Sequence, residues 1–327
     1  MRSLLSIYQT HPESPYRDLK TGSLRPYNCY LGRLENHIGK MRLEEISGVD
    51  IRRWHGIWSG DGEKLAAAAM ARAVFEAALS FGKMLRLAGC TELLDIAREA
   101  RRRLPQPRPR RQTMTAREVE AARAAAHAAG RPSRALAYAV VFETALRLWD
   151  VIGQWHPIDA PGLSTVIDPD RRTKWFGLQW EDVGADMVMR YRPSKTAGTT
   201  QAEIAFSLAD APMVLDELRH WPADRRTGPM IRCEVAGRPY IAQSFGRMWR
   251  ADAKAAGIPA GVWARDLRAS AVTEARAGGV HLDDARHVAG HSSERTTEIY
   301  DRAHAEAAGR FARAREVARA RKPGTDG

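Results

Sequence analysis

The sequence has little cysteine, no long apolar run and no leader-like N-terminus, and each shortage excludes a class of protein. Its three cysteines, Cys29, Cys90 and Cys233, are too few and too scattered for a disulfide framework or a CxxC metal knuckle. No stretch approaches the roughly 18 apolar residues that span a bilayer. The first residues, MRSLLSIYQTHPESPY, lack the apolar core and small-residue cleavage site of a signal peptide. We therefore expect a cytoplasmic protein without a membrane partner.

Positive charge, by contrast, is abundant. The chain has 51 Lys and Arg against 39 Asp and Glu, a formal net charge of +12. Excess cationic charge accelerates encounter with phosphates and strengthens their binding, so a polyanion is expected, nucleic acid first and an anionic membrane surface second. The 44% hydrophobic fraction excludes a mainly disordered chain. A length of 327 residues suggests about two domains.

Apolar residues at helical spacing dominate the first hundred positions. One stripe predicts a helix with Pro26 in its first turn and Gly39 as a left-handed cap. A shorter stripe follows, and a third helix is expected over 63–87, ending before Gly89, with an Ala-rich run that favours helix. Residues 1–100 are therefore predicted to form a small helical bundle. The two stripes consist of Tyr27, Leu31, Leu34 and Ile38, and of Ile51, Trp54 and Trp58.

Arginine and proline are concentrated between Arg101 and Arg111. The run RRRLPQPRPRR contains six Arg and three Pro. Alternating proline favours extended backbone and blocks helix, so residues 101–113 are predicted to be an interdomain linker. The arginines could serve solubility alone, but an extended cationic chain between two domains is well suited to contact the phosphates of a duplex.

Residues 114–327 are predicted to form a second domain that is helical around one small sheet. Thr115 and Glu118 have the spacing of a capping box that opens a helix, and an apolar helix follows over about 133–153. Short strands are expected at 177–183, 187–194 and 202–207. Beyond them the pattern is helical again. The expected fold class is mainly α with a small antiparallel β-sheet (α+β).

Two cations in this domain have ordinary interpretations when each is taken singly. Arg147 falls in the middle of the apolar helix, where a charge is costly unless something pairs with it. Asp150 lies one turn away, and a snorkelling arginine is the other explanation. Lys195 falls in the turn between two predicted strands, where a solvated lysine is ordinary. Neither residue alone indicates a function.

The segment VWARDLRASAVTEARAGGVHLDDARHVAGHSSERTTEIYDR is more informative. Arg265 and Arg268 are three residues apart and hence on one face of a predicted helix. His287 and His291 are four apart, like the paired histidines of a zinc protease. However, Gly290 is expected to end the helix between them, and the Glu of the His-Glu-x-x-His motif is absent. We therefore expect no metal and no cofactor.

Five motifs stand in order along the second half of the chain. They are Thr144-Ala-Leu-Arg147 with Asp150; Trp180-Glu-Asp-Val183 followed by Pro193-Ser-Lys195-Thr; Asp-Leu-Arg268; Gly290-His291-Ser-Ser; and Tyr300, nine residues beyond the histidine. In these motifs and their order the chain resembles the tyrosine recombinases of the phage-integrase type. One motif would be weak, but five in the right order are specific.

The resemblance implies a domain organisation and partners. It implies a catalytic domain over 114–327 with a C-terminal helical tail. Less specifically, because the five motifs lie in the second half of the chain, it implies a helical core-binding (DNA-binding) domain over 1–100. An integrase-like, site-specific DNA recombinase of a bacterial or phage mobile element is expected, acting at the nucleoid. Its implied partners are double-stranded DNA and further copies of itself, a tetramer on paired sites, joined through the C-terminal helix. The extra N-terminal arm-binding domain of some phage integrases is not expected.

The resemblance also implies catalytic roles. Tyr300 would attack the scissile phosphorus and form a 3′-phosphotyrosyl link. Arg147, Arg268 and His291 would stabilise the charge that develops on the nonbridging oxygens, which would make a metal unnecessary. Lys195 would protonate the departing 5′-oxygen.

Two features depart from the family pattern. Arg265 stands where the family most often has the histidine of His-x-x-Arg, the usual acceptor of the tyrosine proton. Arginine cannot accept a proton, although it can contact the phosphate and lower the pKa of the phenol. The stretch 155–175 is longer than the usual path to the sheet and is interpreted as a surface insertion.

Two other functions remain open. A catalytically impaired, recombinase-like DNA-binding regulator or accessory protein is the first, and Arg265 is the residue that leaves it open. A type IB topoisomerase would share much of the catalytic set, but the spacing from His291 to Tyr300 and the compact length resemble integrases more closely.

Overall fold

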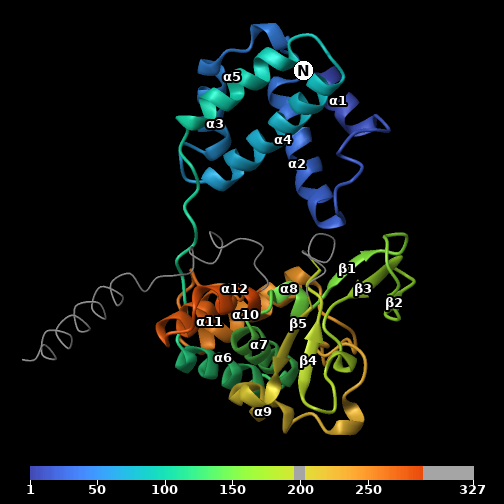
Figure 1. The fold of residues 1–327 in the computed structure, drawn as a ribbon, viewed down its shortest axis with the longest axis vertical. Coiled ribbons are helices and arrows are strands. Elements are labelled where there is room, and N and C mark those ends of the chain that lie inside the picture. Colours follow the sequence, from blue (N-terminus) through green and yellow to red (C-terminus); the bar gives the residue numbers. More distant parts are fainter. Residues whose placement is uncertain (195–202, 290–327) are drawn as a thin grey trace, which may run out of the picture. The chain divides into compact units, whose positions relative to one another are not determined.

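The computed structural model describes residues 1–194 and 203–289. Two compact units divide the chain, an N-terminal unit of Met1–Pro109 and a C-terminal unit of Arg110–Gly327. Each unit has its own cluster of buried apolar side chains. The expectation of a mainly α-helical chain with little sheet is confirmed (Figure 1).

The N-terminal unit is a helical bundle around one central helix. Its helices are α1 (Arg2–Thr10), α2 (Thr21–Ile38), α3 (Gly48–Ser59), α4 (Leu65–Met84) and α5 (Cys90–Arg102), with a short 3-10 turn at Leu43–Glu45. The central helix α4 packs against all four others. Its residues Val74, Phe75, Ala78 and Leu79 are fully buried because they recur at helical spacing on the faces that meet those neighbours.

Helix α4 bears on the expectation that no segment of the chain spans a membrane. Among the described residues it is the one helix that is long and apolar enough to cross a membrane by length and composition. Half of that window is buried inside the protein, and the core helix of a bundle passes the same test. Its apolar character is therefore accounted for by packing.

Helix α2 differs from its predicted form at both ends. It begins at Thr21, so Pro26 lies inside it and removes one backbone hydrogen bond. Gly39 has a right-handed conformation (φ −59°, ψ −27°), so the expected left-handed cap is wrong. Its carbonyl instead accepts a hydrogen bond from the N–H of Arg2 at 2.9 Å. A tertiary contact thus satisfies the helix end, and no left-handed turn is needed.

The C-terminal unit is built on helix α7. Its helices are α6 (Ala116–Ala128), α7 (Pro132–Thr144), α8 (Leu148–Val151), α9 (Pro212–Leu218), α10 (Ala242–Ala255), α11 (Asp266–Ala277) and α12 (Leu282–Val288), with 3-10 turns at Leu208–Asp210 and Ala223–Arg225. Helix α7 contacts α6, α9 and α11 and is buried nearly all round. The predicted capping box is confirmed, because Thr115 and Glu118 exchange side-chain and backbone hydrogen bonds at the start of α6.

Two small antiparallel sheets complete this unit, where one was predicted. The strands β4 (Val188–Tyr191) and β5 (Ile204–Ser207) form a pair, which confirms the strands expected at 187–194 and 202–207. The strands β1 (Gln154–Pro157), β2 (Ile167–Asp168) and β3 (Thr173–Phe176) form the second sheet, in the order β1-β3-β2.

The second sheet overturns two predictions. The stretch 155–175 is not a mere surface insertion, because it supplies this sheet and its Trp175 is 1% exposed, with the indole N–H donating to Ile152 O at 3.2 Å. The strand expected at 177–183 is instead a 3-10 turn, Trp180–Asp182. Asp182 causes this, since its carboxylate accepts the N–H of Gln179 at 2.7 Å and closes the backbone into a turn.

The apolar helix predicted over 133–153 is broken in the middle. Helix α7 ends at Thr144, Ala145 is left-handed (φ 52°), and α8 begins at Leu148. The Thr144 hydroxyl donates to Val140 O at 2.6 Å and accepts the N–H of Leu146 at 3.3 Å, so it competes with the helical ladder. Arg147 is consequently the N-cap residue of α8, and its predicted mid-helix position is wrong.

Candidate functional site

Arg147 and Asp150 lie at the break between α7 and α8. The Arg147 side chain is 21% exposed, and its Nη1 lies 3.9 Å from Asp150 Oδ2. Asp150 is 1% exposed. The predicted pairing of these residues is thus present, but the distance is long. Arg147 therefore places a partly exposed cationic side chain beside a buried carboxylate.

Asp150 also anchors the end of the described hairpin. Its Oδ1 accepts the backbone N–H of Ser194 at 3.1 Å and the Ser194 hydroxyl at 2.7 Å. Burial and the carboxylates of Asp150 and Asp182 together raise the pKa of Tyr191, on the adjoining strand β4. Ser194 immediately precedes Lys195 in the sequence. One buried carboxylate therefore joins the segment of Arg147 to the residue before the predicted catalytic lysine.

Arg268 is the most deeply buried of the predicted site cations whose positions are described. It is 7% exposed and lies in the first turn of α11. Its Nη1 donates to Ala145 O at 2.8 Å, and its Nη2 donates to Ala289 O. The Ala145 carbonyl accepts this bond at the point where α7 has ended. Arg268 thus joins the helix break that carries Arg147 to the residue two positions before His291.

Arg265 lies in different surroundings from Arg268, although a common helical face was predicted for the two. It is exposed at the N-cap of α11, and its guanidinium carbon lies 4.2 Å from the centroid of the Trp263 ring. Stacking on an aromatic ring restricts a long side chain while leaving its charge in place. Arg265 can therefore present a cation near α11, but it offers no acceptor for a proton.

A linker residue joins this cluster from far away in the sequence. Arg110 donates to both carboxylate oxygens of Asp266, at 2.7 and 3.2 Å, and to Gly261 O at 2.7 Å. Its guanidinium carbon also lies 4.1 Å from the centroid of the Trp263 ring. Farther along, Met114 N–H donates to the hydroxyl of Ser270 at 2.7 Å. The start of the C-terminal unit is therefore fixed to the N-terminal half of α11.

Sequence reasoning missed Arg110, Trp263 and Asp266. Arg110 is one of six arginines in the linker, and nothing in the local pattern distinguishes it from the others. Asp266 directly follows Arg265 and Trp263 lies two positions before it, and this proximity was the signal that could have found them. Lys195, His291 and Tyr300 lie outside the described residues, as does the side chain of His287.

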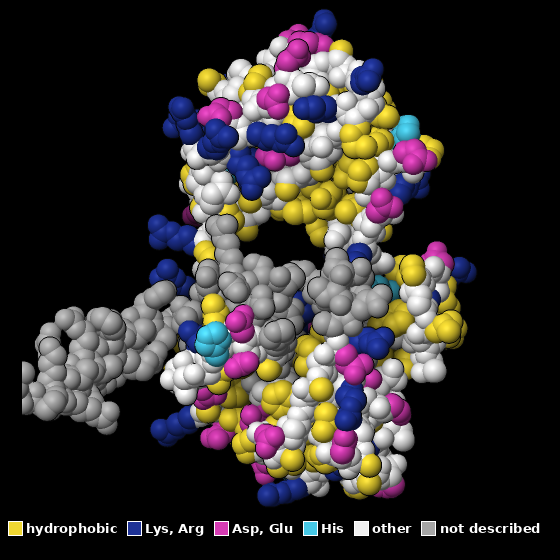
Figure 2. Space-filling model, in the orientation of Figure 1, with side chains coloured by type: hydrophobic (Ala, Val, Ile, Leu, Met, Phe, Trp, Pro, Cys, Tyr) yellow, Lys and Arg dark blue, Asp and Glu magenta, His cyan; other side chains and the backbone are white. Residues whose placement is uncertain are grey.

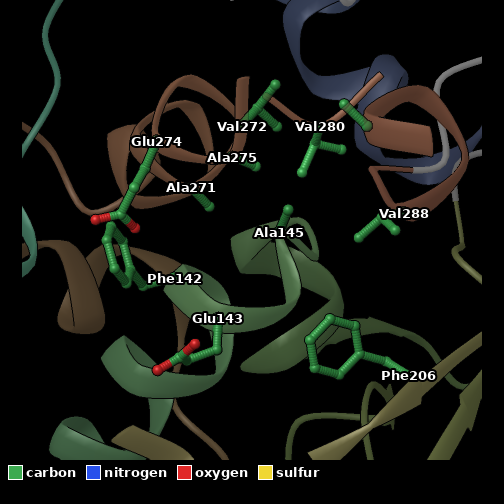
Figure 3. A pocket seen from close by; sticks show the side chains of 11 residues that line it. Phe142, Glu143, Ala145, Phe206, Ala271, Val272, Glu274, Ala275, Val280 and Val288 are labelled. Atoms are coloured by element: carbon green, nitrogen blue, oxygen red, sulfur yellow. The ribbon is translucent and has the colours of Figure 1, made fainter. Parts of the chain in front are cut away.

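An apolar pocket of about 310 Å³ lies beside this cluster. Side chains from α7, β5, α11 and α12 line it, among them Phe206, Val272 and Val288 (Figure 3). Two carboxylates, Glu143 and Glu274, line it on the side where Phe142 lies (Figure 3). Burial raises the pKa of both, and in Glu143 the charge of Glu274 adds to the shift. The pocket is therefore apolar with an acidic edge.

Solved structures of three integrase complexes share the architecture of this chain. A lambda integrase dimer bound to a COC′ core site matches with a TM-score of 0.69 at 19% identity, over 93% of this chain and 96% of that chain. A lambda integrase tetramer bound to a Holliday junction gives 0.66 at 19%, over 91% and 76%. The Tn1549 transposon integrase with transposon right end DNA gives 0.66 at 13%, over 95% and 98%. The chain has the integrase fold.

Sequence comparison gives no such match. No protein-family model and no curated protein matches the chain. The integrase fold is the one that the five motifs implied, so the fold expected from the resemblance is confirmed. In this fold, Arg268 lies in the first turn of α11 and donates to Ala145 O at the end of α7. Arg147 lies just after that helix end, and Arg265 lies just before α11 begins.

Proposed function

We propose that the chain is a site-specific DNA recombinase that cleaves and rejoins strands through Tyr300. The observation that carries this proposal is the pair of hydrogen bonds from Arg268 to Ala145 O and Ala289 O, within the integrase fold. These bonds join Ala145, two residues before Arg147, to Ala289, two residues before His291. A cationic cluster held by buried contacts is suited to stabilising an oxyanion, because its charges need no reorganisation during the reaction.

In the proposed reaction, the Tyr300 oxygen attacks phosphorus while the bond from phosphorus to the 5′-oxygen breaks. The product is a 3′-phosphotyrosyl link and a free 5′-hydroxyl, whose proton comes from Lys195. Arg147, Arg268 and His291 donate to the nonbridging oxygens of the phosphorane. Rejoining is the reverse step with a 5′-hydroxyl of another strand, so the bond energy is conserved. The reaction as written uses no cofactor and no metal.

Arg265 decides how the tyrosine proton is handled. Because arginine stays protonated, the proton of Tyr300 must pass to solvent or to another group. The charge of Arg265, stacked on Trp263, would favour the phenolate instead. The same feature favours the second candidate function, a DNA-binding regulator that has lost cleavage.

Double-stranded DNA is the proposed substrate and partner, bound by both units in the cytoplasm. Lys and Arg side chains occur on both units of the face drawn in Figure 2. We also propose that copies assemble into a tetramer on paired sites through residues 301–327, which lie outside the described part. That tail is basic, with Phe311 and Val317 as apolar anchors. The apolar pocket with its acidic edge at Glu143 and Glu274 is complementary to it.

A nicked suicide substrate carrying the crossover site of the element tests the catalytic proposal. The intact chain is expected to form a covalent protein–DNA adduct, and Tyr300→Phe is expected to form none while retaining DNA binding. Binding without any adduct from the intact chain would favour the regulator instead. Arg265→His in the same assay is expected to raise the cleavage rate, and a slower variant would show that Arg265 is no handicap.

Truncation after Arg302 tests the assembly. The truncated chain is expected to bind a single site but to form no tetramer on paired sites, as measured by analytical ultracentrifugation with DNA. A tetramer of unchanged stability would overturn the role of the tail.

A further inference from the structure

A cluster of metal-ligating side chains lies on elements that carry none of the proposed catalytic residues. His127 is in the last turn of α6, Glu217 is in the last turn of α9, and His220 follows α9 by two residues. The backbone turns there, with His220 N–H donating to Glu217 O at 2.9 Å. Residues from two helices thus meet, although some 90 positions separate His127 from Glu217 in the sequence.

The geometry of this cluster is close to that of a metal site. One ligand atom from each of the three residues lies within 4.8 Å of the other two. His127 Nε2 lies 2.8 Å from Glu217 Oε2, and the two imidazole centroids are 4.5 Å apart. Ligands bound tetrahedrally to zinc at 2.0–2.1 Å lie roughly 3.3 Å from one another. The exposed His220 ring therefore needs only a side-chain adjustment to complete the set.

Glu217 is oriented as a metal-binding carboxylate usually is. It is fully buried, with 0% of its surface exposed. Arg123 Nε donates to its Oε1 at 2.7 Å, and the same guanidinium donates to Asp216 at 2.7 Å. These bonds fix the carboxylate with Oε2 toward His127. Partners of this kind hold ligating carboxylates in place and tune their affinity.

An ion-pair network alone does not account for the position of His220. Such a network would be complete with Arg123, Glu217 and His127. The two imidazole rings lie with their centroids 4.5 Å apart, and a bound cation would use both rings and the Glu217 carboxylate together. His127 is partly exposed and His220 is exposed, so solvent can supply a fourth ligand.

We propose that His127, Glu217 and His220 bind one divalent transition-metal ion and so tie α9 to α6. Imidazole and carboxylate ligands at this spacing favour zinc. The site has no part in the strand-transfer proposal, and it stands or fails independently of it. Its effect is on the stability of the C-terminal unit, since metal binding to the folded state alone stabilises that state.

Titration of the metal-free full-length chain with Zn²⁺ in a calorimeter tests the site, without DNA. His220→Ala is the decisive variant, because an exposed side chain can be removed without disturbing the core. It is expected to weaken Zn²⁺ binding at least about tenfold and to abolish the Zn²⁺-dependent rise in melting temperature. His281→Ala, another exposed histidine in the same unit, is the matched control and is expected to change neither quantity.

Co²⁺ substitution gives a second readout that a purely structural histidine would not affect. The intact chain is expected to show the intense visible absorption of tetrahedral Co²⁺, and His220→Ala to lose it. Equal Zn²⁺ affinity of the intact chain and a His127→Ala/His220→Ala double variant would overturn the proposal. So would the absence of any binding by the intact chain at 100-fold molar excess of Zn²⁺.

Discussion

The bundle core of the N-terminal unit and the arginine cluster of the C-terminal unit are stabilised in different ways. In the bundle, buried residues such as Leu79 and Phe75 come from one amphipathic helix packed on its sequence neighbours. In the cluster, Arg268 is held by Ala145, 123 residues away, and Arg110 by Asp266, 156 residues away. The first depends on apolar area and the second on a few directional bonds. Substitutions should therefore distinguish the two regions by the size of the stability loss and by how far that loss depends on particular hydrogen bonds.

The largest effect is expected for Leu79→Ala in α4. Leu79 is fully buried, and truncation of such a side chain costs about 2–5 kcal/mol, from lost transfer free energy and the cavity left behind. Differential scanning calorimetry should show a lower transition for the N-terminal unit only. Leu136→Ala in α7, equally buried, is the matched variant for the other unit. A shift of both transitions by either variant would show that the units do not unfold separately.

A somewhat smaller effect is expected for Arg268→Ala. Two carbonyls lose a charge-assisted donor, which should lower the free energy of unfolding of the C-terminal unit by about 2–4 kcal/mol. Urea denaturation measures this loss, and the suicide-substrate assay should show no adduct. Arg268→Lys should recover part of the stability but not the forked geometry. The exposed Arg247→Ala should change unfolding by less than about 0.5 kcal/mol. Equal stabilities for the two alanine variants would contradict the assigned bonds.

Arg110→Ala should come next. It removes the forked pair with Asp266 and the stacking on Trp263, and because Arg110 is one-third exposed the loss should be about 1–2 kcal/mol. Thermal unfolding measures it, and the cleavage rate should fall as well, since Asp266 adjoins Arg265. Arg108→Ala, in the same linker and exposed, is the control. If both variants behaved alike, the linker would act through its charge alone.

The smallest effect is expected for an ion pair that is local in the sequence. Arg190 donates to Asp186 at 2.7 Å on the exposed surface of strand β4, and this lowers the pKa of Asp186 to about 2. Because the folded pKa lies below the ordinary value, any stabilisation is present above that value and is lost as pH falls through the folded pKa. Arg190→Ala should return the pKa of Asp186 toward its ordinary value in an NMR titration, with melting unchanged at pH 7. A marked loss of stability at pH 7 would show that this local ion pair stabilises the folded state more than expected.

Much of the fold was predictable wherever a local pattern was sufficient. The apolar spacing of Leu31, Leu34 and Ile38, the capping box at Thr115 and the strand pair β4 and β5 all follow from residues close in the sequence. The predictions failed where a distant group or a single side chain changed the backbone. Arg2 satisfies the carbonyl of Gly39, and Thr144 helps to end α7 before Arg147.

The sequence predicted residues of the candidate site but not their connections. The order of the motifs singled out Arg147, Arg265 and Arg268, and the structure shows where these three lie. Their catalytic roles stay predictions, as do those of Lys195, His291 and Tyr300. No local pattern indicates that Arg265 stacks on Trp263 or that Asp150 holds Ser194. Such contacts depend on directions that side chains take only after distant segments have packed.

The sequence by itself determined the helical character of the chain, its cationic balance and the ordered residues that suggest strand transfer. Helical spacing and capping are properties of neighbours, and charge is additive, so both can be read without coordinates. Only the tertiary structure decided that Arg268 bridges Ala145 and Ala289, that Arg110 fixes α11, and that His127 meets Glu217 and His220. Hydrogen bonds and metal ligation act over a few ångströms, and folding alone brings residues so distant in sequence within that range.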